Sequence, residues 1–535
     1  MRARLWTNAR ITTMDDAKPT AEAILTIDDR IADVGNLDDL QAAAPAGTDT
    51  VDLGGAALFP GFIESHNHMI AYGRSLAAID ARPTQLGSIK ALVAAIRERA
   101  SISPEGGWLI ARGYDDNQLA ERRHPNRHDL DSVSERHPVL LVNGSGHLAV
   151  ANTEALRLAG ITATTENPQG GEIVRDAHGQ ATGLLLETAQ RLVQQAMPDP
   201  TVDDLVDALQ ACHDRYVAAG ITSSHTAGVN STDEVTAHQR WAETADNPLR
   251  KTIMIGRSMF PAFRDTGMHT GFGDDRLRVG PLKLFSDGSL IGRTAAVSQP
   301  FLEDPNPNNL GMEMMPQEEL DAIVLDGHTH GYQVAIHAIG DRAIEMCLDA
   351  FKRAQEAHPR DDARHRIEHC GILRPDLIDR LAREQVIPVS QPVFIREYGE
   401  GFIRHLGRER TALTYPFRSL LGAGIPVVFS SDCPVSAHEP LKSIQASVEE
   451  RTNAGTEYEP QEAITPGEAI RAYTIHGARA GFAEDRVGTI CPGMLADFTI
   501  LARHPEDVAP AEIDQIPVVG TVIGGELAYQ RPMEA

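Results

Sequence analysis

The sequence has few cysteines, and they are not spaced as pairs. Its 535 residues contain five, standing singly at Cys212, Cys347, Cys370, Cys433 and Cys491. Disulfide scaffolds and thiolate zinc sites need closely spaced cysteines, so the sequence argues against both. Isolated cysteines fit a reducing compartment, and we expect a cytoplasmic protein.

The sequence also lacks an excess of positive charge and any long apolar run. Its 49 Lys and Arg residues are outnumbered by 75 Asp and Glu residues, giving a formal net charge of −26. Nucleic acids and anionic membranes carry the same sign of charge, so we expect neither as a partner. No stretch approaches the roughly 20 apolar residues of a membrane helix. The first residues lack the apolar run of a signal peptide.

The chain is long enough for more than one module. A barrel of eight β/α units takes roughly 250 residues, which leaves room for a further module. Residues 1–57 and 485–535 are both rich in short β-type runs and turn formers. These two pieces have the pattern to pair into one small sandwich, although no local feature requires it.

Between these ends, apolar β-type runs alternate with helical segments. The eight runs are FIESHNH, GITSSHT, KTIMIGRS, GPLKLFSD, YQVAIHAIGD, HRIEHCG, VIPVSQP and IPVVFSSD. This alternation is typical of a parallel sheet, and eight strands is the number that a TIM barrel requires. We predict a barrel within residues 58–484. The gap between its first two strands, about 75–215, is far longer than an ordinary connection and predicts an inserted subdomain.

The pair His66 and His68 follows the apolar run ALFPGFI. Residues i and i+2 of a strand point to the same face, so both imidazoles would project into the barrel mouth, where they can share a metal. One such pair is a weak signal among 21 histidines, and His328 and His330 form another by chance.

Other expected strands also end in residues that bind metals. His337 and His369 end two consecutive strands, and Asp432 follows the last. Catalytic groups of TIM barrels come from these carboxyl ends. Four histidines and a carboxylate suit zinc or another divalent first-row metal. Each residue alone could be a strand end satisfied by neighbouring backbone, but the five in this order favour a metal centre with one or two ions.

The sequence resembles the amidohydrolase superfamily, specifically its family-3 branch, which includes N-substituted formamide deformylase-like proteins. The matching segments include LFPGFIESHNH, GGWLIARGYDD, HDLDSVSERHPVLLVNGSGHLAVAN, GPLKLFSDGSLIGRTA, VAIHAIGD, RIEHC, SSDCPV and VGTICPGMLADFTIL. The resemblance implies an α/β fold: a distorted TIM barrel, a composite β-sandwich from both termini and a long substrate-covering insertion after the first strand. It also implies that a metal-activated hydroxide attacks an amide-like carbon.

The resemblance assigns the predicted ligands to two metal positions. His66 and His68 match the ligands of a buried metal, and His337 and His369 match those of a second. Asp432 matches an aspartate that contacts the metal and takes a proton from the bridging water.

Lys283 stands where binuclear members carry a carboxylated lysine that bridges both metals. A lysine is costly in a barrel mouth unless it is modified or paired. The alternative is an unmodified lysine paired with Asp287.

Four further residues lie in matching segments that are expected to face the substrate: Tyr114, Asp115, His147 and Arg293. Each could equally have a structural role. The segment NGSG is not a phosphate loop, because it lacks both a Lys-Ser/Thr ending and a GxGxxG spacing.

We therefore expect an enzyme that hydrolyses a C–N bond, other than a peptide bond, of a small-molecule amide such as an N-substituted formamide. A heterocycle deaminase or cyclic amidase is the alternative on the same scaffold, and a single metal without a modified lysine would favour it. A phosphatase or esterase stays open, because a metal site does not by itself select the electrophile. A catalytically inactive binding module is the remote alternative, since such relatives lose their ligands. The sequence does not decide the oligomeric state, and a homodimer stays open.

Overall fold

The computed structural model describes residues 2–82, 85–116, 118–133, 136–144, 148–168, 170–244, 246 and 249–531. The chain forms two compact units. One joins Met1–Tyr72 with Leu209–Ala535, and the other comprises Gly73–Ala208. Within the described ranges, no helix is both long and apolar enough to cross a membrane.

Eight parallel strands form the central sheet of the first unit, in the order β19-β18-β17-β16-β15-β14-β13-β6. Each strand therefore pairs with its neighbour along the chain. They are β6 (Phe62–Asn67), β13 (Ile221–Val229), β14 (Arg250–Gly256), β15 (Leu277–Phe285), β16 (Val334–Ala338), β17 (Arg366–His369), β18 (Ile387–Ser390) and β19 (Val428–Phe429). All eight runs predicted from the sequence form these strands in order, which confirms the barrel.

Backbone hydrogen bonds join the first and last strands of the barrel. The Asp432 N–H donates to the oxygen of His66 at 2.9 Å, and the His68 N–H donates to the oxygen of Cys433 at 2.8 Å. Both bonds lie just beyond the short β19. They bring the ends of β6 and β19, with their polar residues, side by side.

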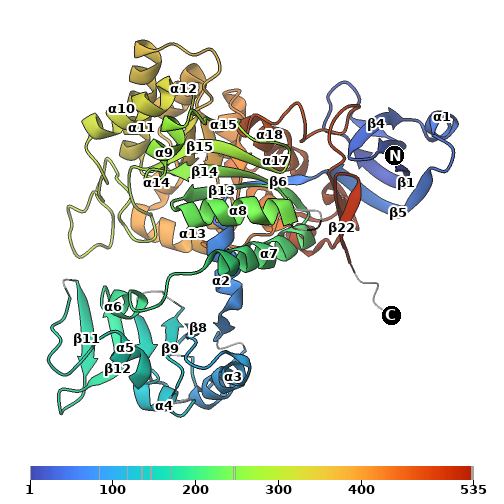
Figure 1. Cartoon of the computed structure of the whole chain (residues 1–535). Helices are drawn as coiled ribbons and strands as arrows, with labels where there is room; N and C mark the ends of the chain where they lie inside the picture. The colour runs from blue at the N-terminus through green and yellow to red at the C-terminus, as the bar shows by residue number, and fades with distance from the viewer. Residues whose placement is uncertain are drawn as a thin grey trace. The chain divides into compact units, whose positions relative to one another are not determined.

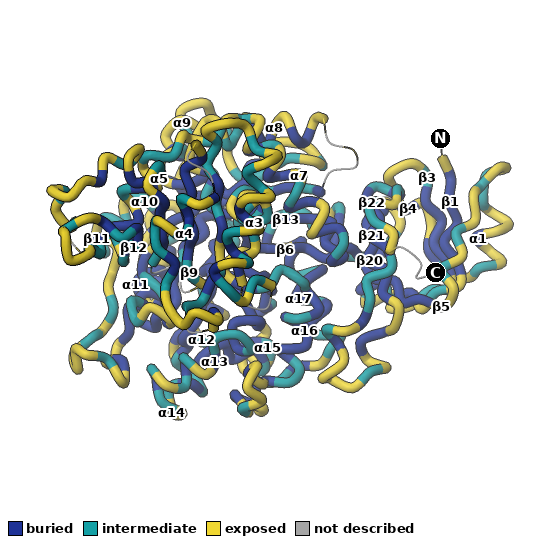
Figure 2. Tube along the Cα trace, turned by 90° about the horizontal axis from the view of Figure 1, so that it is seen from below, coloured by how far each residue is buried: buried dark blue, intermediate teal, exposed yellow. Residues whose placement is uncertain are grey.

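Helices cover the outside of the barrel. They include α8 (Thr232–Thr244), α10 (Gln317–Thr329), α11 (Asp341–Ala357), α12 (Pro375–Glu384), α13 (Val393–Leu406) and α16 (Pro440–Glu449). Figure 1 shows β13, β14 and β15 side by side with α8 in front of them. In α11, buried residues recur every three or four positions, as at Ala343, Cys347, Ala350 and Ala354, which gives the helix one apolar face. In Figure 2, β6 and β13 are coloured dark blue as buried strands.

A second sheet combines strands from both ends of the chain, in the order β22-β21-β20-β5-β1-β3-β4, with β2 (Thr20–Ala21) beside β1. Its other strands are β1 (Ala3–Thr12), β3 (Ala23–Ile27), β4 (Arg30–Gly35), β5 (Asp49–Pro60), β20 (Phe498–Leu501), β21 (Val518–Ile523) and β22 (Glu526–Gln530). The rings of Trp6 and Phe498 pack edge-on at 5.7 Å in its core. The expected β-domain built from both termini is therefore confirmed, while its residue boundaries stay a prediction.

The unit Gly73–Ala208 has a sheet of its own, in the order β11-β12-β10-β9-β8-β7. Its strands are β7 (Ile79–Asp80), β8 (Leu109–Tyr114), β9 (Val139–Asn143), β10 (Leu148–Ala151), β11 (Gly171–Arg175) and β12 (Ala181–Glu187). Helix α3 (Ile89–Ile102) contributes Leu92 and Ile96 to a core that also contains Leu109 and Leu141. Along the chain the unit falls between β6 and β13, where an inserted subdomain was expected.

Candidate metal centre

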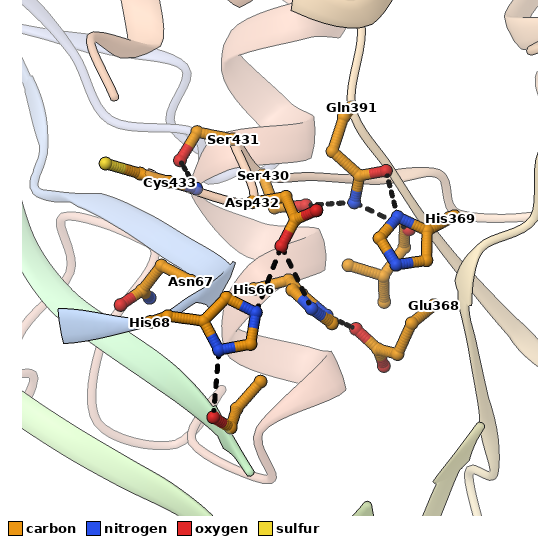
Figure 3. A network of polar contacts seen from close by, with 12 residues as sticks. His66, Asn67, His68, Glu368, His369, Gln391, Ser430, Ser431, Asp432 and Cys433 are labelled. Carbon is orange, nitrogen blue, oxygen red and sulfur yellow. Dashed lines mark hydrogen bonds and ion pairs between the residues drawn. The ribbon is translucent and has the colours of Figure 1, made fainter. Parts of the chain in front are cut away.

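Three of the predicted ligands converge where the barrel closes (Figure 3). Oδ1 of Asp432 lies 3.2 Å from Nε2 of His68 and 3.5 Å from Nε2 of His66. The three ligand atoms lie within 4.8 Å of one another. Two imidazoles and a carboxylate at this spacing are a donor set that zinc and other first-row divalent ions prefer. The residues present therefore fit a divalent metal.

Two residues of the centre have a left-handed backbone, with φ of 59° at Asp432 and 70° at His369. Residues other than glycine adopt such angles at a cost of about 1–3 kcal/mol, and they are concentrated at functional sites. The Asp432 N–H bond to His66 and a 3.1 Å bond from the Cys370 N–H to the oxygen of Ala338 hold the two turns. The rest of the barrel fold must therefore offset the cost of these two backbone conformations, which position the side chains of Asp432 and His369.

Hydrogen bonds orient the first two imidazoles. Nδ1 of His68 lies 3.2 Å from the backbone oxygen of Ala227. Nδ1 of His66 contacts the carboxylate of Glu368. Both rings therefore present Nε2 to the side of Asp432, which is the arrangement of metal ligands whose other nitrogen is hydrogen-bonded.

His337 and His369 lie beside this pair. Their ring centroids are 4.4 Å apart, and the ring of His369 lies 5.1 Å from that of His66. Hydrogen bonds at 2.9 Å from His337 Nε2 to Gly288 and at 2.8 Å between His369 Nδ1 and Gln391 leave the opposite nitrogens available to a metal. Burial lowers the pKa of His337 to about 4 and lowers that of His369 well below its usual value. Both imidazoles are therefore in the neutral form that binds metals.

Lys283 lies in the same region, and its Nζ is 4.8 Å from the centroid of the Phe285 ring. Its side chain is buried, and its Nζ has no hydrogen bond in the described part of the chain. The alternative pairing with Asp287 is absent from these described residues, because that carboxylate accepts three backbone N–H groups at 2.8–3.0 Å. Burial lowers the pKa of Lys283 to about 8, opposed by the charges of Glu368 and Asp432. A buried amine that forms no hydrogen bond is costly, and carboxylation of Lys283 stays a prediction.

The comparisons with known proteins identify the family of this chain. A family model described as "Amidohydrolase family" matches residues 49–529. The N-substituted formamide deformylase of Arthrobacter pascens is 30% identical over 544 residues, which cover 99% of each chain. This chain belongs to the amidohydrolase family.

Other relatives also cover almost the whole chain. Protein LONG AFTER FAR-RED 3 of Arabidopsis thaliana is 31% identical over 541 residues, covering 98% of this chain and 91% of that one. A metal-dependent hydrolase from Pyrococcus horikoshii superposes with a TM-score of 0.80 at 25% identity, over 95% of this chain and 99% of the other. Membership of this family makes the protein a hydrolase, and the solved relative indicates that its activity depends on a metal.

Sequence reasoning missed the buried charges beneath the centre of this amidohydrolase. Arg366 and Glu368 are fully buried and share two hydrogen bonds, at 2.8 and 3.0 Å. Glu64 is also fully buried and accepts the backbone N–H of His66 at 3.2 Å, and burial raises the pKa of Glu64 to about 8. The available signal was strand alternation, since Glu64 and His66 share one face of β6.

Arg293, predicted to contact substrate, is engaged within its own loop. Its guanidinium lies 3.3 Å from the carboxylate of Asp304 and donates to the backbone oxygen of Glu303 at 2.9 Å. Its role in substrate binding stays a prediction.

Two of the other predicted substrate residues belong to the unit Gly73–Ala208. Tyr114 is buried in that unit's core, and its hydroxyl lies 3.2 Å from Nδ1 of His124. Asp115 accepts a 2.6 Å hydrogen bond from Gln118. His147 lies outside the described residues. Substrate contact by these three residues also stays a prediction.

Proposed function

We propose that this amidohydrolase cleaves the C–N bond of a small linear amide, with N-substituted formamides as the first class to test. The observation that carries the proposal is the convergence of His66, His68 and Asp432 beside His337 and His369 at the carboxyl ends of the barrel strands. The name of the Arthrobacter pascens relative, an N-substituted formamide deformylase, supports the substrate class.

The side chains of the proposed centre would have different roles in hydrolysis. A bound divalent ion would lower the pKa of water from about 16 to roughly 7 and polarise the scissile carbonyl. Each of the four imidazoles is hydrogen-bonded through one ring nitrogen and would bind an ion through the other. Asp432 lies where it can take a proton from the attacking water and return it to the leaving amine. Burial raises the pKa of Asp432, opposed by its bond to His68, which makes the carboxylate a stronger base.

We infer that the neutral amine of Lys283 adds CO₂ and loses a proton to form a carbamate, which would help to hold two ions. A carbamate carries a negative charge and two oxygens, so it would turn an amine that forms no hydrogen bond into a ligand for cations that otherwise repel. Lys283→Ala should therefore lose the second metal and most activity, and added short carboxylic acids should partly restore both. Elemental analysis and activity assays with and without acetate measure these effects.

A second buried lysine supplies the control. Lys251 on β14 is buried against the ring of Trp241, 4.0 Å from its centroid. Lys251→Met should keep both metals, although its stability will fall. A Lys283→Ala protein with two metals and normal turnover would contradict the role of the Lys283 carbamate. High-resolution density showing a bare ammonium beside a single metal would favour the deaminase reading.

A substrate panel tests the proposed reaction. The zinc-loaded enzyme would be assayed against N-formyl and N-acyl amines, cyclic amides and aminopyrimidines. We expect release of amine from the linear amides and loss of this activity with a chelator. Ammonia released from aminopyrimidines would instead identify a deaminase, and ring opening would identify a cyclic amidase. Full activity in metal-free protein would refute the metal mechanism.

A further inference from the structure

Each of the four proposed metal-binding histidines has one ring nitrogen that would not bind the metal. The four differ in the hydrogen-bond partner of that nitrogen. Three rings form their hydrogen bonds with neutral oxygens, namely the backbone of Ala227 for His68, the backbone of Gly288 for His337 and the amide of Gln391 for His369. Nε2 of His337 also lies 3.5 Å from the carboxylate of Asp287, but that carboxylate already accepts three backbone N–H groups. His66 meets a carboxylate, that of Glu368. The side chains of this pair are 1% and 0% exposed, so water does not screen the contact.

Glu368 is held in place from three strands. Arg366, also 0% exposed, donates to both of its carboxylate oxygens. The same guanidinium donates to the backbone oxygen of Ser65 at 2.8 Å and lies 3.2 Å from Nδ1 of His225. Arg366 on β17 is thereby tied to β6 and β13. A buried carboxylate is costly unless it is paired in this way, and the pairing holds Glu368 in position against His66.

When a carboxylate accepts a hydrogen bond from one nitrogen of an imidazole, the other nitrogen becomes a stronger metal ligand. A backbone or amide oxygen does this less well. Loss of such a partner typically weakens metal binding about 10–100-fold.

We propose that the two metal positions are unequal, and that the ion at His66, His68 and Asp432 is the more tightly held because Glu368 acts as a positioning residue behind His66. This inference rests on the proposed metal centre. The ion at His337 and His369 is then the first to leave, and enzyme prepared with limiting metal carries its ion at the His66 position.

The wild-type enzyme tests the order of loss without any substitution. Zinc-loaded protein would be equilibrated with increasing chelator, the bound zinc counted, and the ion that survives partial removal located by anomalous diffraction. We expect two dissociation constants at least about tenfold apart, with the surviving ion beside Asp432. A surviving ion at His337 and His369, or simultaneous loss of both, would overturn the inference. Protein that never binds zinc would contradict the proposed function instead.

Two substitutions test the role of Glu368. Glu368→Gln keeps a hydrogen-bond acceptor but removes the charge, and should raise the dissociation constant of the tighter ion about 10–100-fold while leaving the weaker ion within about threefold. Gln391→Ala, the control behind His369, should weaken the other ion selectively. Melting temperatures of the metal-free proteins separate this pattern from general destabilisation, which would weaken both positions together. A folded Glu368→Gln protein with unchanged tight binding would show that Glu368 has no positioning role.

Discussion

We expect His68→Ala to lose metal and to lower kcat/KM by about 10³-fold or more. Nε2 of His68 lies 3.2 Å from Asp432, so the substitution removes one of the converging donors without removing a buried charge. A catalytic metal supplies several kcal/mol of transition-state stabilisation, and each ~1.4 kcal/mol is a factor of ten in rate. Metal content by elemental analysis and kcat/KM on the substrate found in the panel measure the two losses.

The control is His330, which belongs to the second His-x-His pair of the sequence, His328 and His330, and is not expected to bind a metal. His330 directly follows α10, is half exposed and pairs with Asp326 at 3.0 Å, so His330→Ala should keep metal and activity. His66→Ala should lose metal as His68→Ala does, and should also melt at a lower temperature, because it leaves Glu368 and Arg366 buried beside a void. Full metal content in His68→Ala would show that the ligand assignment is wrong.

Asp432→Asn should lower kcat about 10²–10⁴-fold, the usual contribution of a positioned acid or base. The amide keeps the shape of the side chain and one oxygen near His66 and His68, but it has no basic oxygen to accept a proton. The backbone bond from Asp432 to His66 does not involve the side chain, so the barrel should still close. We therefore expect the variant to fold and to retain most of its metal.

Steady-state kinetics with parallel metal analysis separate the two roles of Asp432. A kcat within about threefold of wild type would refute proton transfer, since that loss is far below what an acid–base group contributes. If metal content and kcat fall by the same factor, the main role of Asp432 is to bind the metal.

The barrel could be predicted because its signals are local. Each of the eight strands is an apolar run a few residues long, and the helices between them show apolar residues every three or four positions. The candidate ligands were found in the same way, as polar side chains that end apolar runs. Those runs lie at one end of a parallel barrel, so the order of elements alone placed His66, His337 and His369 near one another.

The sequence by itself thus determined the fold class, the end of the barrel that carries the candidate centre, and the residue types of the candidate ligands. The tertiary structure decided the partners of those ligands. Glu368 meets His66 across 302 residues, and Arg366 meets His225 across 141. Asp287, the nearest carboxylate to Lys283 along the chain, instead binds backbone groups up to 53 residues away. No local pattern reports such contacts, because a buried charge selects its partner by which strands the closed barrel brings together.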